Sequence, residues 1–131
     1  MVKPDIWGPH GWKFIHYIAL NFPNNPNLQT QQNYKNFFQN LQFILPCDKC
    51  KQHYSIHIQK HKIDSFLHSR KSLFQWTVDI HNLVNQDLHK KTYSYDEALS
   101  IYSNPPQSSN TVYILLILFL LFLCLFFLFN L

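Results

Sequence analysis

A pair of cysteines directly after a proline constrains this chain more than any other feature of its sequence. Cys47 and Cys50 are two of only three cysteines in 131 residues, and Pro46 precedes them. Proline has no backbone N–H and suits the first turn of a helix, so we expect Cys47 at a helix N-terminus and Cys50 one turn later. Unpaired N–H groups and the helix dipole stabilise a thiolate at that position. The spacing therefore predicts a dithiol that cycles through a short-loop disulfide.

Three other interpretations of the same cysteines are weaker. A structural zinc site needs two further ligands, and no second cysteine pair exists. His53, His57 and His61 follow at helical spacing, but one straight helix cannot wrap a tetrahedron, so we predict no metal site. We expect His57 and His61 on a solvated edge. An inert structural pair remains open. A thioredoxin-like carrier is disfavoured because no alternating strand and helix pattern surrounds the cysteines.

The sequence before residue 103 predicts an all-α domain. It has only two glycines, and apolar residues recur at three-and-four spacing, as in amphipathic helices. We expect helices over residues 9–21, 28–45, 47–60 and 69–87. A short fifth helix should run to residue 102, because Ser94 and Glu97 have the spacing of a capping box. No glycine-rich nucleotide loop is found, which excludes a Rossmann or Walker site.

The segment from Val112 to Phe129 has a different composition. It holds eighteen residues without a charge, close to the ~20 that cross a bilayer as a helix. We therefore expect a domain over residues 1–102, a polar Pro/Ser linker over 103–111 and a C-terminal transmembrane anchor over 112–131. The net charge of +4 predicts that the domain stays on the cytoplasmic side. Its basic residues are scattered, so we predict no nucleic-acid partner.

Several polar residues interrupt the apolar stripe of the fourth expected helix. His81, Asn82 and Asn85 lie one turn apart beside it, and a buried amide without a partner costs about 1–3 kcal/mol. These side chains therefore predict a ligand rich in heteroatoms. Lys90 and Lys91 follow and are suited to an anion. On the first expected helix, Trp12 and His16 are four residues apart and share one face.

Taken in order, these motifs give the chain a family resemblance. The first is Trp7-Gly8-Pro9-x-x-Trp12-x-x-x-His16, the second is Cys47-x-x-Cys50-x-x-His53-Tyr54, and the third is Trp76 with His81-Asn82-x-Val84-Asn85. Over about residues 6–102 the chain resembles the FAD-linked sulfhydryl oxidases of the Erv/ALR type. The resemblance implies a four-helix bundle plus a short fifth helix that binds FAD non-covalently, commonly as a homodimer.

The resemblance also implies roles for individual residues. Cys50 would face the flavin, and Cys47 would exchange with thiol-containing protein substrates or a small thiol-redox carrier. Electrons would pass from the cysteine pair to FAD and then to molecular oxygen, giving hydrogen peroxide. The residues expected to contact FAD are Trp7, Gly8, Trp12, His16, His81, Asn82, Val84, Asn85, Lys90 and Tyr102.

The chain departs from many members of that family in two places. Val78 and Tyr95 occupy the positions of a structural disulfide, and no separate shuttle C-x-x-C is found. This minimal form is similar to the versions encoded by large cytoplasmic DNA viruses, which would place the enzyme at a host cytoplasmic or virion membrane. The alternative from another class is a membrane-anchored zinc or scaffold module that recruits cytoplasmic partners.

Overall fold

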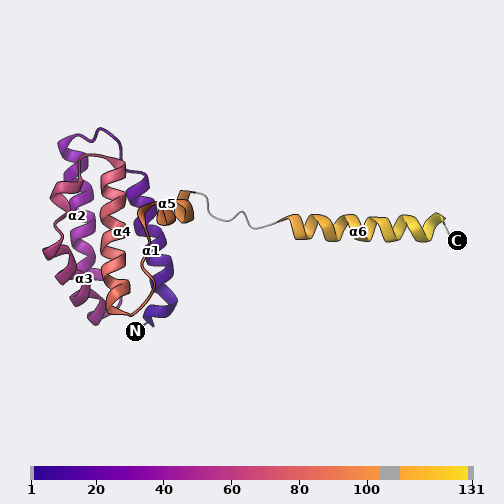
Figure 1. Ribbon diagram of the computed structural model, residues 1–131, viewed down its shortest axis with the longest axis horizontal. Coiled ribbons are helices and arrows are strands. Elements are labelled where there is room, and N and C mark those ends of the chain that lie inside the picture. The colour runs from indigo at the N-terminus through magenta and orange to yellow at the C-terminus, as the bar shows by residue number, and fades with distance from the viewer. Residues whose placement is uncertain (1, 104–109, 130–131) are drawn as a thin grey trace.

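The computed structural model describes residues 2–103 and 110–129, and within them every regular element is helical. Figure 1 shows the elements in chain order. They are α1 (Pro4–Leu20), α2 (Leu28–Ile44), α3 (Asp48–Lys60), a one-turn 3-10 helix η1 (Ile63–Phe66), α4 (Arg70–Asp87), α5 (Tyr95–Ser103) and α6 (Asn110–Phe129).

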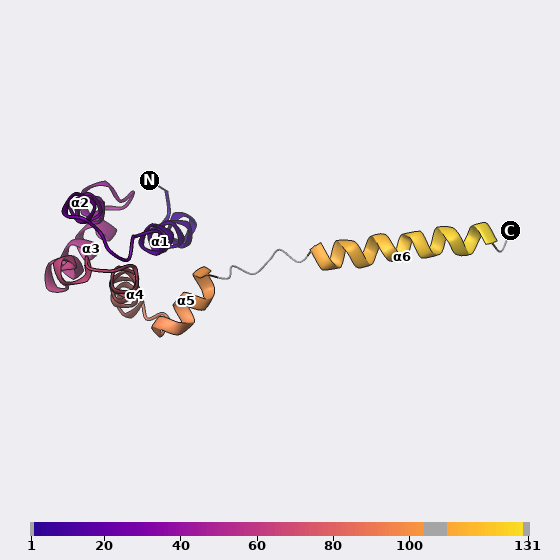
Figure 2. The same ribbon diagram turned by 90° about the horizontal axis from the view of Figure 1, so that it is seen from above.

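The first four α-helices form a bundle, and α5 lies across its edge. α1 packs on α4, α2 packs on α3, and α5 contacts both α1 and α4, as the view along the bundle shows (Figure 2). Trp76, Phe38 and Phe22 are fully buried in the core, where the rings of Phe38 and Trp76 meet edge to face at 5.3 Å. The indole N–H of Trp76 donates to the His61 carbonyl at 2.8 Å. The predicted four-helix bundle with a short fifth helix is confirmed.

Side-chain caps fix where several helices begin. Asn27 accepts from the Thr30 N–H at 2.8 Å at the start of α2, and Ser69 accepts from the Ser72 N–H at 3.2 Å at the start of α4. Before α5 the predicted capping box is present, because the Glu97 N–H donates to Ser94 Oγ while the Ser94 N–H donates to the Glu97 carboxylate. Each cap satisfies an N–H group that the helix itself leaves without an acceptor.

The expected start of the first helix was wrong. α1 begins at Pro4, five residues before the predicted boundary, and passes through Gly8 and Pro9 without a turn. Pro4 stands in the first turn, where proline's missing N–H costs nothing. Because the helix is already formed at that point, Trp7 and Gly11 lie one turn apart on α1, and a Cβ on Gly11 would approach the Trp7 ring to 3.2 Å.

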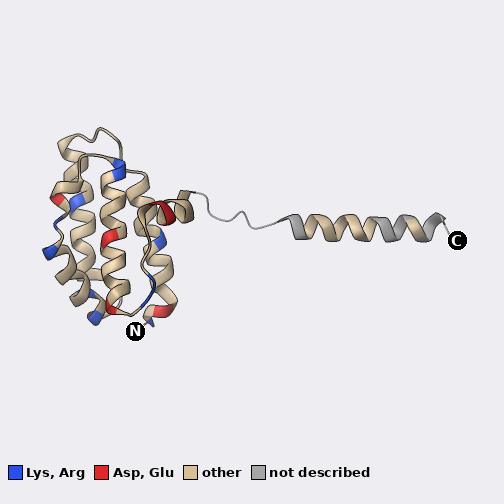
Figure 3. Cartoon of the chain, viewed as in Figure 1, with Lys and Arg blue, Asp and Glu red and all other residues tan. Residues whose placement is uncertain are grey.

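The helix α6 stands apart from the bundle in both ribbon views (Figures 1 and 2). Among the described residues no helix is long and apolar enough to cross a membrane, so the predicted transmembrane anchor is not supported. The predicted linker over 103–111 lies mostly outside the described residues, and α6 already begins at Asn110. The described charged residues all belong to the part of the chain before α6 (Figure 3).

Candidate functional site

A cavity of about 780 Å³ opens between α1, α3, α4 and α5. This volume is within the range of about 300–1,000 Å³ typical of small-molecule and cofactor sites. All the residues predicted to carry chemistry or to bind a cofactor line it: Trp7, Gly8, Trp12, His16, Cys47, Cys50, His81, Asn82, Val84, Asn85, Lys90 and Tyr102. The helical spacing thus brings three separate motifs to one site, while the contacts of each residue with a ligand remain predictions.

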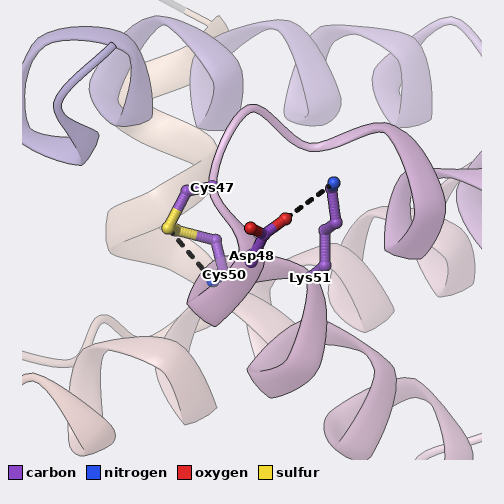
Figure 4. Close-up of a disulfide and its surroundings, with 4 residues drawn as sticks. All are labelled: Cys47, Asp48, Cys50 and Lys51. Carbon is purple, nitrogen blue, oxygen red and sulfur yellow. Dashed lines mark hydrogen bonds and ion pairs between the residues drawn. A yellow bond between two sulfur atoms is a disulfide. The ribbon is translucent and has the colours of Figure 1, made fainter. Parts of the chain in front are cut away.

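The two cysteines form a disulfide at the N-terminus of α3 (Figure 4). Cys47 is the N-cap residue, in extended conformation, and its sulfur accepts the Cys50 N–H at 3.2 Å. The predicted position of Cys47 is confirmed, but Pro46 lies before the helix and not in its first turn. Cys47 is 8% exposed and Cys50 is half-buried, and both line the cavity.

The residues between and after the cysteines carry opposite charges that meet each other. Asp48 turns its carboxylate toward Lys51, and the two side chains are 3.0 Å apart (Figure 4). A free carboxylate beside the sulfurs would disfavour a thiolate, since like charges repel. Pairing with Lys51 reduces that effect, while the first-turn N–H groups of α3 remain directed at Cys47.

Two histidines, of which His16 is buried and His81 partly buried, form one wall of the cavity. His16 Nδ1 lies 2.9 Å from Thr77 Oγ1, and His16 Nε2 lies 3.0 Å from His81 Nδ1. Burial, followed by the nearby His81, lowers the pKa of His16 to about 3. Burial, followed by the charge of Lys90, lowers the pKa of His81 to about 4. Both imidazoles are therefore neutral at physiological pH.

Aromatic side chains surround this pair. The Trp12 ring stacks on His81 with a centroid distance of 4.1 Å and an angle of 8° between the planes. The Tyr102 ring, from α5, packs against the His16 ring with a centroid distance of 4.3 Å. Trp7 supplies an unpaired donor, because its buried indole N–H is without a hydrogen-bond partner among the described residues. A ligand with a flat ring and acceptor atoms would match these walls.

Asn82 differs from the expectation that its amide waits for a ligand. Its Nδ2 donates to the Tyr93 carbonyl at 2.8 Å, and its Oδ1 accepts the Tyr93 N–H at 2.9 Å. Asn82 therefore holds the loop between α4 and α5 against α4. It shapes the cavity through Tyr93, whose ring also lines the site.

Asn85 and the lysines after α4 bring polar and charged groups to the cavity. Asn85 is 6% exposed, and within the described part of the chain its side-chain amide makes no hydrogen bond. Its backbone carbonyl accepts the Lys90 N–H at 2.8 Å, which positions Lys90 after α4. Lys90 and Lys91 both line the cavity. Lys91 is 3.1 Å from the Glu97 carboxylate, so the positive charge at the α4–α5 end comes mainly from Lys90, which has no ion pair among the described residues. That end is suited to a phosphate group.

Sequence reasoning missed three residues of the site. Thr77, Gly11 and Tyr93 each act on a predicted residue: Thr77 binds His16, Gly11 makes room for Trp7, and Tyr93 is held by Asn82. Only Gly11 could have been identified from the sequence, because it is one of two glycines in the chain and follows Trp7 by four residues, which is one helical turn.

Three further histidines, two on α3 and one at its C-cap, are partly exposed and have acidic partners on α4. His53 Nδ1 and His57 Nε2 contact the same oxygen of Asp87, at 3.0 Å and 2.7 Å. His61 Nε2 contacts Asp79 at 3.1 Å, and the Tyr95 hydroxyl donates to the other oxygen of Asp79 at 2.8 Å. The expectation that His57 and His61 are merely solvated was wrong, because each forms a contact between helices.

Comparison with known proteins agrees with this site. The chain is 41% identical over 99 residues to a probable FAD-linked sulfhydryl oxidase of Acanthamoeba polyphaga mimivirus, covering 75% of this chain and 69% of that protein. It is 31% identical over 96 residues to the FAD-linked sulfhydryl oxidase of an African swine fever virus isolate from Kenya, covering 73% and 79%. A mitochondrial FAD-linked sulfhydryl oxidase of Schizosaccharomyces pombe matches at 33% identity, covering 70% of this chain and 51% of that protein.

The fold and a family model lead to the same group. The crystal structure of the yeast Erv1 core superposes with a TM-score of 0.74 at 23% identity, covering 80% of this chain and 87% of that one, which establishes a shared fold. The model of the Erv1 / Alr family matches residues 9–103, which include Cys47, Cys50 and the helices that line the cavity except for the first turns of α1, where Trp7 and Gly8 lie. The chain therefore belongs to the Erv1 / Alr family.

Proposed function

We infer that this protein is an FAD-linked thiol oxidase that generates disulfide bonds in substrate thiols. The observation that carries this conclusion is the Cys47–Cys50 disulfide, which lies at a helix N-terminus and opens onto a cavity of cofactor size. Relatives named as FAD-linked sulfhydryl oxidases support the same activity. Membership of this family does not favour the alternative of a zinc or scaffold module.

The residues present fit FAD. The unpaired Trp7 N–H requires an acceptor, and the flat Trp12–His81 stack is matched to an aromatic ring system. Lys90 supplies positive charge for a pyrophosphate, beside Lys91, which is paired with Glu97. Asn85 contributes an amide without a partner among the described residues. When bound, FAD supplies the two-electron chemistry, taking electrons from the dithiol and passing them to dioxygen to give hydrogen peroxide.

The protein's own chemistry is thiol–disulfide exchange. A substrate thiolate attacks the Cys47 sulfur, the Cys47–Cys50 bond breaks, and Cys50 leaves as a thiolate on the cavity side. A second substrate thiol then attacks the mixed disulfide at the substrate sulfur and frees Cys47. The substrate is thereby oxidised by two electrons and the cysteine pair is reduced by two. The Cys50 N–H, already bonded to the Cys47 sulfur at 3.2 Å, stabilises negative charge on that sulfur.

Substituting each cysteine of the full-length protein tests this function. We expect the protein to bind FAD, to absorb visible light as flavoproteins do, and to consume oxygen when given dithiothreitol. Cys50→Ser should lower turnover by at least a factor of about 100, because no internal disulfide can form. Cys124→Ser is the matched control, since it removes the third cysteine, in α6, and should leave turnover unchanged. Full turnover by Cys50→Ser would refute the assignment.

A trapping experiment tests the separate roles of the two cysteines. When Cys50→Ser is given glutathione disulfide, the Cys47 thiolate should attack it, release one reduced glutathione and keep the other as a stable mixed disulfide, which intact-mass spectrometry detects. In Cys47→Ser the remaining Cys50 should trap less, because it is assigned to the cofactor side. Equal trapping by both variants would contradict the assignment of substrate exchange to Cys47.

We also propose that residues 112–129 attach the protein to a membrane, with the basic domain on the cytoplasmic side of a host or virion membrane. The uncharged sequence of this segment supports the proposal. Retention in the pellet after an alkaline carbonate wash, and its loss when three of these leucines are replaced by lysine, would be the expected result. Recovery of the unchanged protein in the washed supernatant would contradict it.

We further propose that two chains form a homodimer. Ile6 and Phe14 on α1 and Phe43 and Ile44 on α2 are large apolar side chains that are each at least 60% exposed, and covering them would be favourable. Sedimentation analysis of the full-length protein in detergent should give the mass of two chains. Replacing Phe14 and Phe43 by glutamate should convert it to one.

A further inference from the structure

The buried His16 has no ring nitrogen left for a ligand. Its Nδ1 lies 2.9 Å from Thr77 Oγ1 and its Nε2 lies 3.0 Å from His81 Nδ1. His16 is 1% exposed and Thr77 is 0% exposed, so no solvent competes for these contacts. His16 can reach the cavity only with its ring face, so of these two histidines only His81 can form a hydrogen bond with a ligand.

The Thr77 hydroxyl determines the direction of this chain of hydrogen bonds. Thr77 Oγ1 lies 2.7 Å from the Phe74 carbonyl oxygen. Two oxygens this close repel unless a proton lies between them, and a carbonyl has none to give. The hydroxyl therefore donates to Phe74. Its oxygen can then only accept from His16, which places the proton of His16 on Nδ1.

The remaining protons follow from the chemistry of imidazole. A neutral imidazole carries one N–H, so Nε2 of His16 is an acceptor and His81 must donate from Nδ1. His81 is left with an unprotonated Nε2. Among the described residues this atom has no hydrogen-bond partner, and His81 lines the cavity with its ring plane fixed by the stacked Trp12 at 4.1 Å.

We propose that Thr77 is a positioning residue that sets the tautomers of His16 and His81, so that His81 offers an acceptor to a hydroxyl or amino donor of FAD. The proposal rests on the function inferred above. It assigns Thr77 an effect on a ligand that it does not touch. The opposite arrangement, in which Thr77 donates to His16, would reverse every bond and make His81 Nε2 a donor, which would repel the same ligand group.

Imidazole nitrogen spectra of the full-length protein test the tautomers directly. The ¹⁵N chemical shift separates protonated from unprotonated ring nitrogens. In the unmodified protein at pH 7 we expect Nδ1–H and bare Nε2 for both His16 and His81, with and without FAD. Thr77→Val removes the hydroxyl at constant shape and should abolish this pattern, whereas Thr77→Ser should restore it. Observation of Nε2–H on His81 in the unmodified protein would overturn the proposal.

The FAD dissociation constant provides the second measurement. Thr77→Val should weaken FAD binding about tenfold, the effect of one hydrogen bond of about 1.4 kcal/mol, and Thr77→Ser should stay within about twofold. Ser72→Ala is the matched control, since it removes another buried hydroxyl of α4 outside this hydrogen-bonded chain. Failure of the unmodified protein to bind FAD would refute the proposed function. Normal FAD binding by Thr77→Val would refute the role of Thr77 alone.

Discussion

The two groups of histidines in this bundle show how the same side chain acquires different properties. His16 and His81 are enclosed between α1, α4 and α5, contact each other, and are kept neutral by burial. His53, His57 and His61 follow one another along α3 and each meets a carboxylate of α4. The first group shapes a ligand cavity, whereas the second connects two helices at the surface.

The difference shows that sequence spacing is a poor guide to the role of a histidine. The α3 histidines have regular four-residue spacing and resemble ligands in the sequence, yet carboxylates 18 to 34 residues away bind them. The cavity histidines are 65 residues apart and acquire their function only when α1 packs on α4. Burial and the identity of the neighbour, more than position along a helix, separate the two groups.

Removing a member of the buried pair should have the largest effect on stability. His16→Phe leaves the Thr77 oxygen and the His81 Nδ1–H without partners, and we expect a loss of about 3 kcal/mol in the free energy of unfolding. Urea denaturation followed by circular dichroism measures it. His68→Phe is a suitable control, because His68 is exposed and bonds only to a backbone carbonyl nearby. Equal losses of unfolding free energy in both variants would show that the buried position of His16 does not increase its contribution to stability.

The second largest effect should be the dependence of stability on pH, to which the cavity histidines contribute. Because burial holds the pKa of His16 near 3 and that of His81 near 4, both below the ordinary 6.5, the unfolded chain takes up protons first as the pH falls. Their stabilising contribution is complete above pH 6.5 and is lost progressively as the pH falls toward 4 and then 3. The free energy of unfolding should decline by up to about 1.4 kcal/mol per pH unit for each histidine.

Denaturation curves at pH 7.0, 6.0 and 5.0 measure this slope. His16→Phe should reduce it, because one of the two groups is gone. A slope in His16→Phe equal to that of the unmodified protein would show that the buried pair does not titrate as the geometry requires.

The surface group should respond much less to loss of its carboxylate. Asp87→Asn replaces the ionic partner of His53 and His57, and we expect a loss below about 1 kcal/mol because these contacts are partly exposed. Hydrogen bonds from His57 and then His53 hold the pKa of Asp87 below its usual range, so its contribution is present above that ordinary value and is lost below it. Urea denaturation at pH 7 measures the change, with Asp96→Asn as an exposed control. If Asp87→Asn lowered the free energy of unfolding as much as His16→Phe does, the cavity histidines and those along α3 would not differ in their contribution to stability.

The smallest effect should come from the hydroxyl that ties α5 to α4. Tyr95→Phe removes the hydrogen bond to Asp79 and should cost about 0.5–1 kcal/mol, since Tyr95 is 42% exposed. Amide hydrogen exchange should accelerate in α5 and stay unchanged in α2. Tyr95 occupies a position where the family resemblance implies half of a structural disulfide in many members. Acceleration in α2 as well as in α5 would show that this contact supports the whole bundle.

Most of the fold and the identity of the cavity residues could be predicted from the sequence. Periodic apolar residues locate the helices, the Ser94–Glu97 spacing predicts the cap of α5, and local motifs identify the cysteines and His81. The contacts made by polar side chains could not be predicted, because their partners lie far away in the chain. Asn82 binds a loop residue, and the hydroxyl of Thr77 binds His16, which lies 61 residues away on α1.

The paired bonds of Asn82 have a consequence for how this position can vary. Its amide donates a hydrogen bond to the Tyr93 carbonyl and accepts one from the Tyr93 N–H, as a neighbouring peptide group in a sheet would. Aspartate cannot donate and leucine can do neither, so only a primary amide of this length serves. Evolutionary retention of asparagine here would thus record the anchoring of a loop, even in a descendant that had lost its cofactor.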